Sequence, residues 1–388
     1  MNGFSRDQYR VAIVGAGVVG LFTAYYILQA GGGPVLLVDR RFLSGGASGR
    51  NGGGVRQQWE SSATVRLAQE SVAAYRRFGT EFGYNVWFRQ GGYLFLAETE
   101  LELDRLRTVQ RVARESGLPA RLLDADGIRG VAPVLERRGL AGGTFLHSDG
   151  TLYPFPAVFG LYERVCALGA EVAFGVDAHG VRGEGGRVRG LVTDRGDVGA
   201  TTVVNAAGGW SAEFAARSGV PIPNTPTRHE ILATEPLKPF LDPMVVRLRD
   251  GLYFSQTMRG EIVGGLTMKH PPGTDGGMSS STAFLRAFAR AIVGLVPALG
   301  SLRVLRAWSG FYDDTPDGLP IVGEDPRLAG FVQANGFGGH GFMLAPATSR
   351  RAAAAALGER VDLDPGLFGP GRFLGAERRR PVEGLSLG

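Results

Sequence analysis

The sequence predicts a mixed α/β fold with two parts, a parallel βαβ unit at the start of the chain and an antiparallel sheet in the second half. Residues 10–14 and 35–38 are short apolar runs, and residues 18–30 between them have the length and composition of a helix. The second half contains four short runs typical of strands, at 230–234, 245–248, 252–255 and 261–266. Because 388 residues exceed one typical domain, we expect two domains.

Other segments have clear helical or strand patterns. Further helices are predicted at residues 61–82, 98–117, 157–168 and 281–296, and further strands at 171–174 and 201–205. Prolines between residues 221 and 226 indicate a domain boundary. Glycine-rich loops like those near the start return at 306–323 and 331–345, so the end of the chain is expected to rejoin its beginning.

The composition excludes several classes of protein. The net charge is +5, but the basic residues are scattered, without the clustered stripe that nucleic-acid binding requires. The one basic cluster, residues 378–380, is expected to be a solvent-exposed end. Cys166 is the only cysteine, which rules out intrachain disulfides and cysteine-ligated zinc or iron–sulfur clusters. No metal site is predicted, because four of the histidines share no ligand spacing, namely His147, His179, His229 and His270.

The apolar run at residues 11–28 is not expected to be a signal sequence. It carries glycines at turn spacing and is followed by a strand. No other stretch approaches the roughly 20 apolar residues of a membrane span. We therefore expect a cytoplasmic, soluble protein.

The βαβ unit carries a dinucleotide-binding motif. Gly15 permits a tight turn, Gly17 lets the backbone approach a pyrophosphate at the helix N-terminus, and Gly20 lets the helix pack closely on the sheet. Asp39, at the end of the second strand, is placed to bond the ribose hydroxyl. Strand, helix, strand and acid together make this a specific signal.

FAD fits the motif better than NAD. A second glycine-rich loop, residues 44–54, follows the second strand, and its amides can surround phosphates and the flavin edge. A second Gly-x-Gly-x-x-Gly motif for NADPH is missing, which disfavours a monooxygenase. The predicted cofactor is FAD.

At these motifs the chain resembles the D-amino-acid oxidase superfamily, nearest to its sarcosine oxidase β-subunit-like and glycine oxidase-like branch. The matching stretches are residues 11–40, 46–58, 203–211, 306–323 and 335–346. The resemblance implies a discontinuous, Rossmann-like FAD-binding domain with a mainly antiparallel substrate domain inserted twice. The implied FAD-binding parts are residues 1–85, 140–220 and 305–375, the substrate-domain parts 86–139 and 221–304, and the tail 376–388.

The motifs and the resemblance together imply a set of cofactor-binding residues. They are Gly15, Gly17, Val18, Val19, Gly20, Asp39, Arg40, Ala47, Ser48, Arg50, Asn51, Gly52, Gly53, Ala178, Ala207, Gly208, Trp210, Gly310, Gly336, Phe337, Gly338, Gly339, His340, Gly341, Phe342 and Met343. The amides of residues 338–343 would face the flavin C2 carbonyl, where negative charge accumulates on reduction.

Several residues are candidates for handling the substrate. Arg56 is a bidentate cation for a carboxylate, with a structural ion pair as the alternative. Tyr253 could bond the same carboxylate or belong to the core, and His340 could act near the substrate nitrogen or pack the loop. Trp308, with Tyr312 and Phe342, could wall an apolar pocket or lie in the core.

The chain departs from the resembled branch at informative positions. Gly310 stands where some members carry a cysteine that binds flavin covalently, so FAD is expected to be non-covalent. Met343 replaces a carboxylate-binding lysine, and Ile262 an oxygen-activating lysine for which Lys269 could substitute. Residues 149–154 lack the histidine that anchors a second flavin in heterotetrameric relatives.

The expected function is therefore oxidation of a small secondary amino acid such as sarcosine, by hydride transfer to FAD and with O₂ as electron acceptor. A dehydrogenase that passes electrons to a quinone or partner subunit is the first alternative. A non-catalytic flavin subunit and an adenine-nucleotide sensor are further alternatives. The sequence leaves the choice between a monomer and an assembly with partner subunits open.

Overall fold

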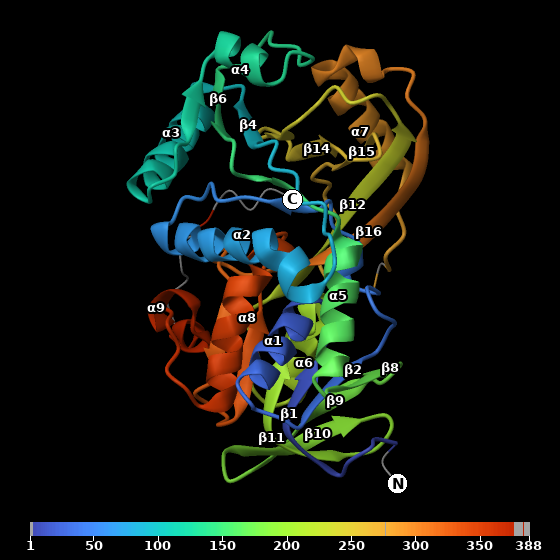
Figure 1. The fold of residues 1–388 in the computed structure, drawn as a ribbon, viewed down its shortest axis with the longest axis vertical. Helices are drawn as coiled ribbons and strands as arrows, with labels where there is room; N and C mark the ends of the chain where they lie inside the picture. The colour runs from blue at the N-terminus through green and yellow to red at the C-terminus, as the bar shows by residue number, and fades with distance from the viewer. Residues whose placement is uncertain (1–2, 276, 376–382, 384–388) are drawn as a thin grey trace.

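The computed structural model describes residues 3–275, 277–375 and 383. Two eight-stranded sheets follow each other along the long axis of the molecule (Figure 1). The expected arginine cluster at residues 378–380 lies outside the described residues. Glu383 is described and is buried, and its carboxylate accepts the amides of Glu60 and Ser61 at 3.1 and 2.9 Å.

The first sheet contains the predicted βαβ unit. Its strand order is β17-β18-β11-β1-β2-β8, with β10 pairing β11 and β9 pairing β10. The strands are β1 (Gln8–Val14), β2 (Val35–Asp39), β8 (Glu171–Phe174), β9 (Ala178–Glu184), β10 (Arg187–Thr193), β11 (Val198–Asn205), β17 (Ile321–Glu324) and β18 (Phe331–Asn335). The central strands run parallel and are buried on both faces, which explains why they are continuous apolar runs rather than alternating ones.

Four helices cover one face of this sheet, and they are α1 (Val18–Gln29), α2 (Ser62–Phe82), α5 (Pro154–Ala167) and α8 (Gly341–Leu357). In Figure 1, α2 crosses the middle of the molecule, and α1 and α8 lie below it. The other face packs against α6 (Ser211–Arg217). Ser61 caps the start of α2 and Gly83, at φ +74°, ends it, as glycine commonly does at a helix C-terminus. α5 begins three residues earlier than predicted, because Pro154 suits the first helical position.

The second sheet is antiparallel except where β13 pairs β4. Its order is β16-β12-β15-β14-β13-β4-β6-β5. The strands are β4 (Tyr93–Ala97), β5 (Arg121–Leu123), β6 (Gly142–Leu146), β12 (Thr225–Pro236), β13 (Met244–Arg247), β14 (Leu252–Gln256), β15 (Glu261–Gly265) and β16 (Val304–Asp314). The helices that pack on it are α3 (Glu100–Glu115), α4 (Ala125–Val131) and α7 (Thr282–Leu295).

The remaining elements are short. The strands β3 (Gly54–Val55) and β7 (Gly150–Thr151) pair with each other. The short helices are η1 (Ala47–Gly49), η2 (Gly208–Trp210), η3 (Pro297–Leu299), α9 (Pro365–Phe368) and η4 (Pro370–Phe373).

Two expected domain boundaries need correction. The boundary between residues 139 and 140 assigned β6 to the cofactor side, and that between 304 and 305 assigned most of β16 to it. Both strands pair in the second sheet, β6 with β4 and β5, and β16 with β12. β12 and β16 are long enough to reach from the second sheet down to the first, as Figure 1 shows, so a cut at residue 305 divides a continuous ladder.

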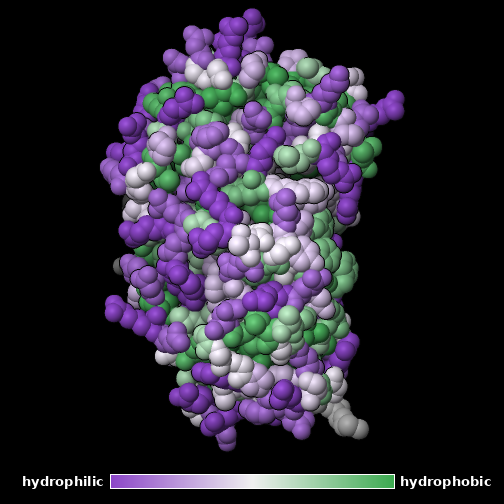
Figure 2. Space-filling model, viewed as in Figure 1, coloured by the Kyte–Doolittle hydropathy of each residue, from purple (hydrophilic) through white to green (hydrophobic). Residues whose placement is uncertain are grey.

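No helix in the described part of the chain is long and apolar enough to cross a membrane. Hydrophilic side chains are spread over the face shown in Figure 2, and hydrophobic ones form small groups rather than one continuous patch.

Candidate functional site

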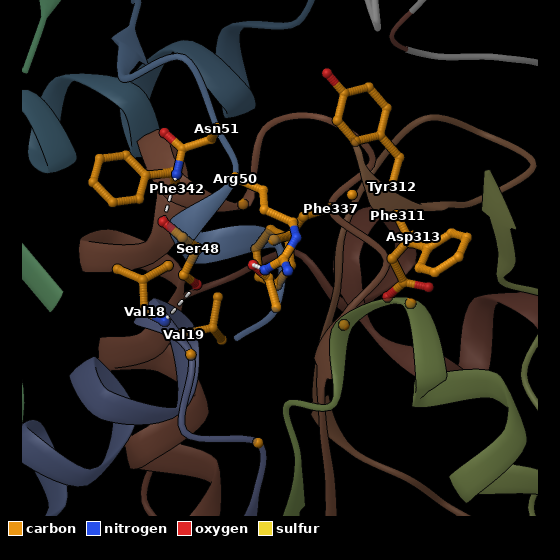
Figure 3. A pocket seen from close by; sticks show the side chains of 18 of the residues that line it. Val18, Val19, Ser48, Arg50, Asn51, Phe311, Tyr312, Asp313, Phe337 and Phe342 are labelled. Atoms are coloured by element: carbon orange, nitrogen blue, oxygen red, sulfur yellow. Dashed lines mark hydrogen bonds between the residues drawn. The ribbon is translucent and has the colours of Figure 1, made fainter. Parts of the chain in front are cut away.

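A deep cavity lies where the two sheets meet, and glycine-rich loops from the start, middle and end of the chain line it. In Figure 3 the beginning of α1 and the loop of Ser48 form one wall, and residues 311–313 of β16 form the opposite wall. Arg50 lies between the two walls. Segments distant in sequence therefore converge on one site.

The turn before α1 is built so that bare backbone faces the cavity. Gly15 has φ +103°, and a Cβ there would lie 2.3 Å from the carbonyl oxygen of Ala206. A Cβ on Gly20 would lie 1.9 Å from the oxygen of Gly15, so Gly20 allows close packing of the helix. Gly17 is the N-cap of α1 and has no side chain of its own to bond the first amides, of which that of Val18 donates to Ser48 Oγ. The other amides of this first turn form an anion-binding N-terminus.

Asp39 lies at the end of β2, on the cavity wall. Its carboxylate accepts the amide of Ala16 at 2.9 Å and the amide of Arg41 at 2.8 Å. Burial raises the pKa of Asp39, and these two amides act against the shift. The acid thus fixes the glycine turn and still presents oxygen lone pairs to the cavity.

The second glycine loop is tied to α1. Ser48 Oγ accepts the amide of Val18 at 2.9 Å, and Asn51 Nδ2 donates to the carbonyl of Ser48 at 2.7 Å, as the dashed lines in Figure 3 show. Arg50 Nη1 donates to the carbonyl of Gly45 at 2.6 Å. Trp308 Nε1 donates to the carbonyl of Arg50 at 3.0 Å and thereby supports the loop from behind.

One end of the cavity is shaped for a flat, polar group. The guanidinium carbons of Arg40 and Arg41 each lie 5.4 Å from the ring centroid of Trp210, and Ala178 lies on the same wall. Trp210 follows β11 in the loop that contains Ala207 and Gly208. This end lies next to Asp39, where the nucleotide half of a dinucleotide would lie.

The other end contains Arg56, which is 3% exposed. Its Nη1 donates to the carbonyl of Gln58 at 2.7 Å, and its Nη2 lies 3.0 Å from Nε2 of His340. The guanidinium carbon lies 3.9 Å from the ring centroid of Trp59. His340 is the N-cap of α8, and its ring packs edge-on against Trp59 at 4.7 Å. Two residues that were separate candidates in the sequence are thus brought together across 284 residues.

Burial and the positive charge of Arg56 keep His340 neutral. Burial lowers the pKa of His340 well below its ordinary value, and the positive charge of Arg56 adds to the effect. Asp149 and Glu383 are buried carboxyl groups whose negative charges act on Arg56. Burial raises the pKa of each of them to about 7. A neutral His340 ring accepts a hydrogen bond from the guanidinium, which fixes its orientation.

A stack of three rings lines the same cavity. His229 on β12 is sandwiched between Tyr253 on β14, at a centroid distance of 5.6 Å, and Tyr312 on β16, at 4.6 Å. His229 Nε2 is buried and has no hydrogen-bond partner among the described residues. Burial lowers the pKa of His229 to about 3, with a smaller effect of His270 in the same direction. The ring is therefore a neutral acceptor or donor on the cavity wall.

This burial gives a prediction for acid stability. Folded His229 binds fewer protons than unfolded His229 between pH 6.5 and about 3, so acidification through this window destabilises the fold. We expect H229Q to lose less melting temperature than the unsubstituted protein between pH 7 and pH 5. Thermal unfolding at both pH values measures the difference, with H147Q, a change at an exposed histidine, as control. Equal acid sensitivity of H229Q and the unsubstituted protein would contradict the prediction.

Most of the predicted site residues line the cavity, but three do not. Gly20, Trp308 and Gly336 lie behind the lining and shape it. Sequence reasoning missed other lining residues, among them Arg41, Asp177, His229, Met244, Met278, Phe311 and Asp313. In the β12–β16 ladder His229 pairs with Gly310 and Asp313 with Pro226, and this long-range pairing sets their places on the cavity wall, so short-range patterns gave no signal for them. Lys269 is exposed and does not line the cavity.

The residues present fit FAD. The cavity offers the glycine-rich N-terminus of α1, an acid at the end of the second strand and a second amide-rich loop, in the order in which a dinucleotide needs them. Gly310 offers no nucleophile, and a Cβ there would already lie 3.4 Å from Cβ of Arg50. Among the described residues no group of three histidine, cysteine, aspartate or glutamate side chains is placed to hold a metal ion.

Known proteins share this architecture. The sarcosine oxidase subunit beta of Rhodobacter capsulatus is 29% identical over 350 residues, which cover 88% of this chain and 83% of the relative. The glycine oxidase of Geobacillus kaustophilus is 28% identical, with 88% and 91% covered. The crystal structure of L-proline dehydrogenase from P. horikoshii superposes with a TM-score of 0.89 at 30% identity and covers 96% of this chain and 100% of that chain.

A family model described as FAD dependent oxidoreductase, DAO, matches residues 10–355. That range includes every glycine turn of the cavity as well as Arg56, Tyr253 and His340. The chain therefore belongs to the DAO family of FAD-dependent oxidoreductases, in the branch that contains sarcosine oxidase β subunits and glycine oxidase.

Proposed function

We propose that the chain oxidises a small amino acid at a carbon–nitrogen bond, with sarcosine or a related N-methyl or secondary amino acid as substrate. The observation that carries the proposal is the pairing of Arg56 with His340 beside the stacked His229, Tyr253 and Tyr312. It combines a carboxylate-binding cation with a small aromatic enclosure. The sarcosine and glycine oxidases among the relatives support this choice of substrate.

FAD, when bound, would supply an acceptor for the hydride that leaves the carbon beside the nitrogen. Arg56 would bind the substrate carboxylate by charge-assisted hydrogen bonds, and His340 would hold the guanidinium in place. Neutral His229 would contact the substrate nitrogen through its unpartnered Nε2. The rings of Tyr253 and Tyr312 exclude water around that nitrogen, which favours the uncharged amine that hydride loss requires. For an N-methyl amino acid, imine hydrolysis then gives formaldehyde and the free amine.

The amides at the start of α8 would stabilise negative charge on the cofactor. The helix begins at Gly341 and His340 caps it without a side-chain bond, so its first amides face the cavity wall. We propose that the cofactor is held non-covalently, because Gly310 and its neighbours present no thiol there.

Anaerobic mixing of the purified holoprotein with sarcosine, L-proline, glycine and D-alanine tests the proposal. We expect the yellow absorbance of oxidised FAD to bleach fastest with the N-methyl or secondary amino acids. Bleaching only with primary amino acids would show that the substrate is a primary rather than an N-methyl or secondary amino acid. No bleaching with any member of the panel would overturn the proposal.

Electron transfer to O₂ with formation of H₂O₂ is the preferred second half-reaction. A dehydrogenase is the second candidate. Lys269, the lysine that could have activated oxygen, is exposed and does not line the cavity, and the chain is similar to L-proline dehydrogenase. H₂O₂ released in air at the rate of substrate consumption supports the oxidase. Reoxidation only by a quinone or an added partner protein supports the dehydrogenase.

The β-subunit names of the relatives raise the question of a partner chain. We propose that the chain turns over substrate by itself, because it carries both sheets and all walls of the cavity. Size-exclusion chromatography combined with an activity assay on the isolated chain checks this expectation. An inactive chain that gains activity with a second subunit would contradict it.

A further inference from the structure

Asp313 is a buried carboxylate that the proposed reaction does not use. It lies near the end of β16, is 4% exposed and lines the cavity. Figure 3 places it on the wall opposite Val18 and Ser48, with its carboxylate directed away from Tyr312. A buried acid on the wall of a redox cofactor site affects both the charge and the proton balance of that site.

The contacts of Asp313 link it to the loop that leads to His340. Oδ2 accepts the amide of Gly336 at 2.6 Å, and the backbone carbonyl of Asp313 accepts the amide of Gly338 at 2.9 Å. Gly336 and Gly338 both have positive φ, at +72° and +57°. The side chain and backbone of Asp313 therefore hold this loop in a conformation that suits glycine.

The second oxygen of Asp313 contacts an amide side chain. Oδ1 accepts Nδ2 of Asn224 at 3.1 Å, and the same nitrogen donates to Oδ1 of Asn335 at 3.0 Å. Oδ1 of Asn224 is buried and has no hydrogen-bond partner among the described residues. Rotation of this amide would offer an acceptor to a protonated Asp313, in exchange for the bond from Asn224 to Asn335. Both protonation states can thus be hydrogen-bonded in the same place.

The surroundings favour a proton on Asp313 near neutral pH. Burial raises its pKa to about 7, the amide of Gly336 and Asn224 act against the shift, and the charge of Asp314 adds to it. The pKa of Asp314 is itself raised by burial, against a hydrogen bond from Thr227. On the neighbouring strand β12, Pro226 and Thr225 pair with residues 313 and 314, and neither carries a charge.

We propose that Asp313 binds a proton when the cofactor in the adjoining cavity becomes negatively charged, and so couples proton uptake to reduction. In this step the substrate hydride delivers two electrons and one proton, and solvent delivers a second proton. The second proton forms an O–H bond on the carboxylate of Asp313, and no bond breaks there. The summed charge of the cofactor and the Asp313 carboxyl group then stays constant. The inference rests on FAD as the cofactor and not on the identity of the amino acid.

The test is the pH dependence of the FAD midpoint potential in the holoprotein and in D313N. Above pH 7, where the carboxyl group of Asp313 is mostly ionised before reduction, the unsubstituted protein should take up as much as about one proton more per pair of electrons than D313N. D126N is the control, because the side chain of Asp126 is 90% exposed. Asp149 and Glu383 also have raised pKa values, but any proton that they bind appears equally in both proteins. Equal proton uptake by D313N and the unsubstituted protein would overturn the inference.

An infrared difference spectrum keeps the test decisive if D313N binds FAD poorly. Reduction of the unsubstituted holoprotein, labelled with ¹³C at aspartate carboxyl groups, should produce the carbonyl band of a protonated carboxylic acid. D149N should retain that band. Loss of the band in D149N, or no band in the unsubstituted protein, would contradict the role of Asp313. Bleaching by amino acids is measured separately, so the proposed function can hold even when this inference fails.

Discussion

G15A should abolish the retention of FAD while leaving most of the chain folded. The new Cβ would lie 2.3 Å from the oxygen and 2.8 Å from the carbon of Ala206, and both belong to backbone that cannot yield as a side chain does. The loop after β11 must then move away from the end of β1, which opens the cavity at its narrowest turn. We expect FAD affinity to fall by about 100-fold or more, equivalent to about 3 kcal/mol. Equilibrium titration of the apoprotein with FAD measures it.

G31A is the matched control for this variant. Gly31 also has a positive φ, +71°, but no atom lies within 4 Å of the position of its Cβ. It should therefore lose about 1–2 kcal/mol of stability from backbone strain alone and bind FAD normally. If both variants bind FAD equally well, the close approach of Gly15 to Ala206 does not shape the cofactor site.

R56A should show the largest loss of substrate turnover. Removal of the guanidinium takes away the proposed carboxylate ligand and leaves Asp149 and Glu383 without its positive charge. Truncation of one member of a buried charged pair costs about 2–4 kcal/mol, which lowers kcat/KM by roughly 30- to 700-fold. R56K should recover only part of the activity, because an ammonium lacks the planar fork. Steady-state kinetics with the best amino acid measures both.

Two comparisons isolate the carboxylate contact. R111A removes an arginine that is 61% exposed on α3 and should leave kcat/KM unchanged. A substrate analogue in which the carboxylate is replaced by a neutral amide should be oxidised slowly by the unsubstituted protein and equally slowly by R56A. If R56A discriminates against the amide as strongly as the unsubstituted protein does, Arg56 is not the anchor.

Local patterns were enough for the cofactor half of the fold. The βαβ unit, its glycine turn and Asp39 lie within 32 residues (8–39), and short-range periodicity, turn residues and helix polarity determine them. The loops at residues 44–54 and 337–343 line the same cavity, and the glycine-rich composition of these loops, together with the resemblance, pointed to them.

Features that depend on long-range pairing could not be predicted. The placement of β6 and β16 in the second sheet follows from ladders with β4 and β12, and no local signal separates a long connecting strand from a domain boundary. The register of β12 against β16 also places His229 beside Tyr312. In this position the His229 ring is buried, and burial lowers its pKa to about 3, so that it is neutral. Burial sets its pKa, and burial is a property of the assembled sheets.

The most direct measurement is the stoichiometry of flavin in the protein after gentle purification, together with titration of the apoprotein with FAD. The convergence of three glycine loops on one cavity predicts a yellow protein that binds about one FAD per chain and releases it intact on denaturation, as a non-covalent complex does. A colourless protein that fails to bind added FAD would contradict the assignment of this cavity as an FAD site.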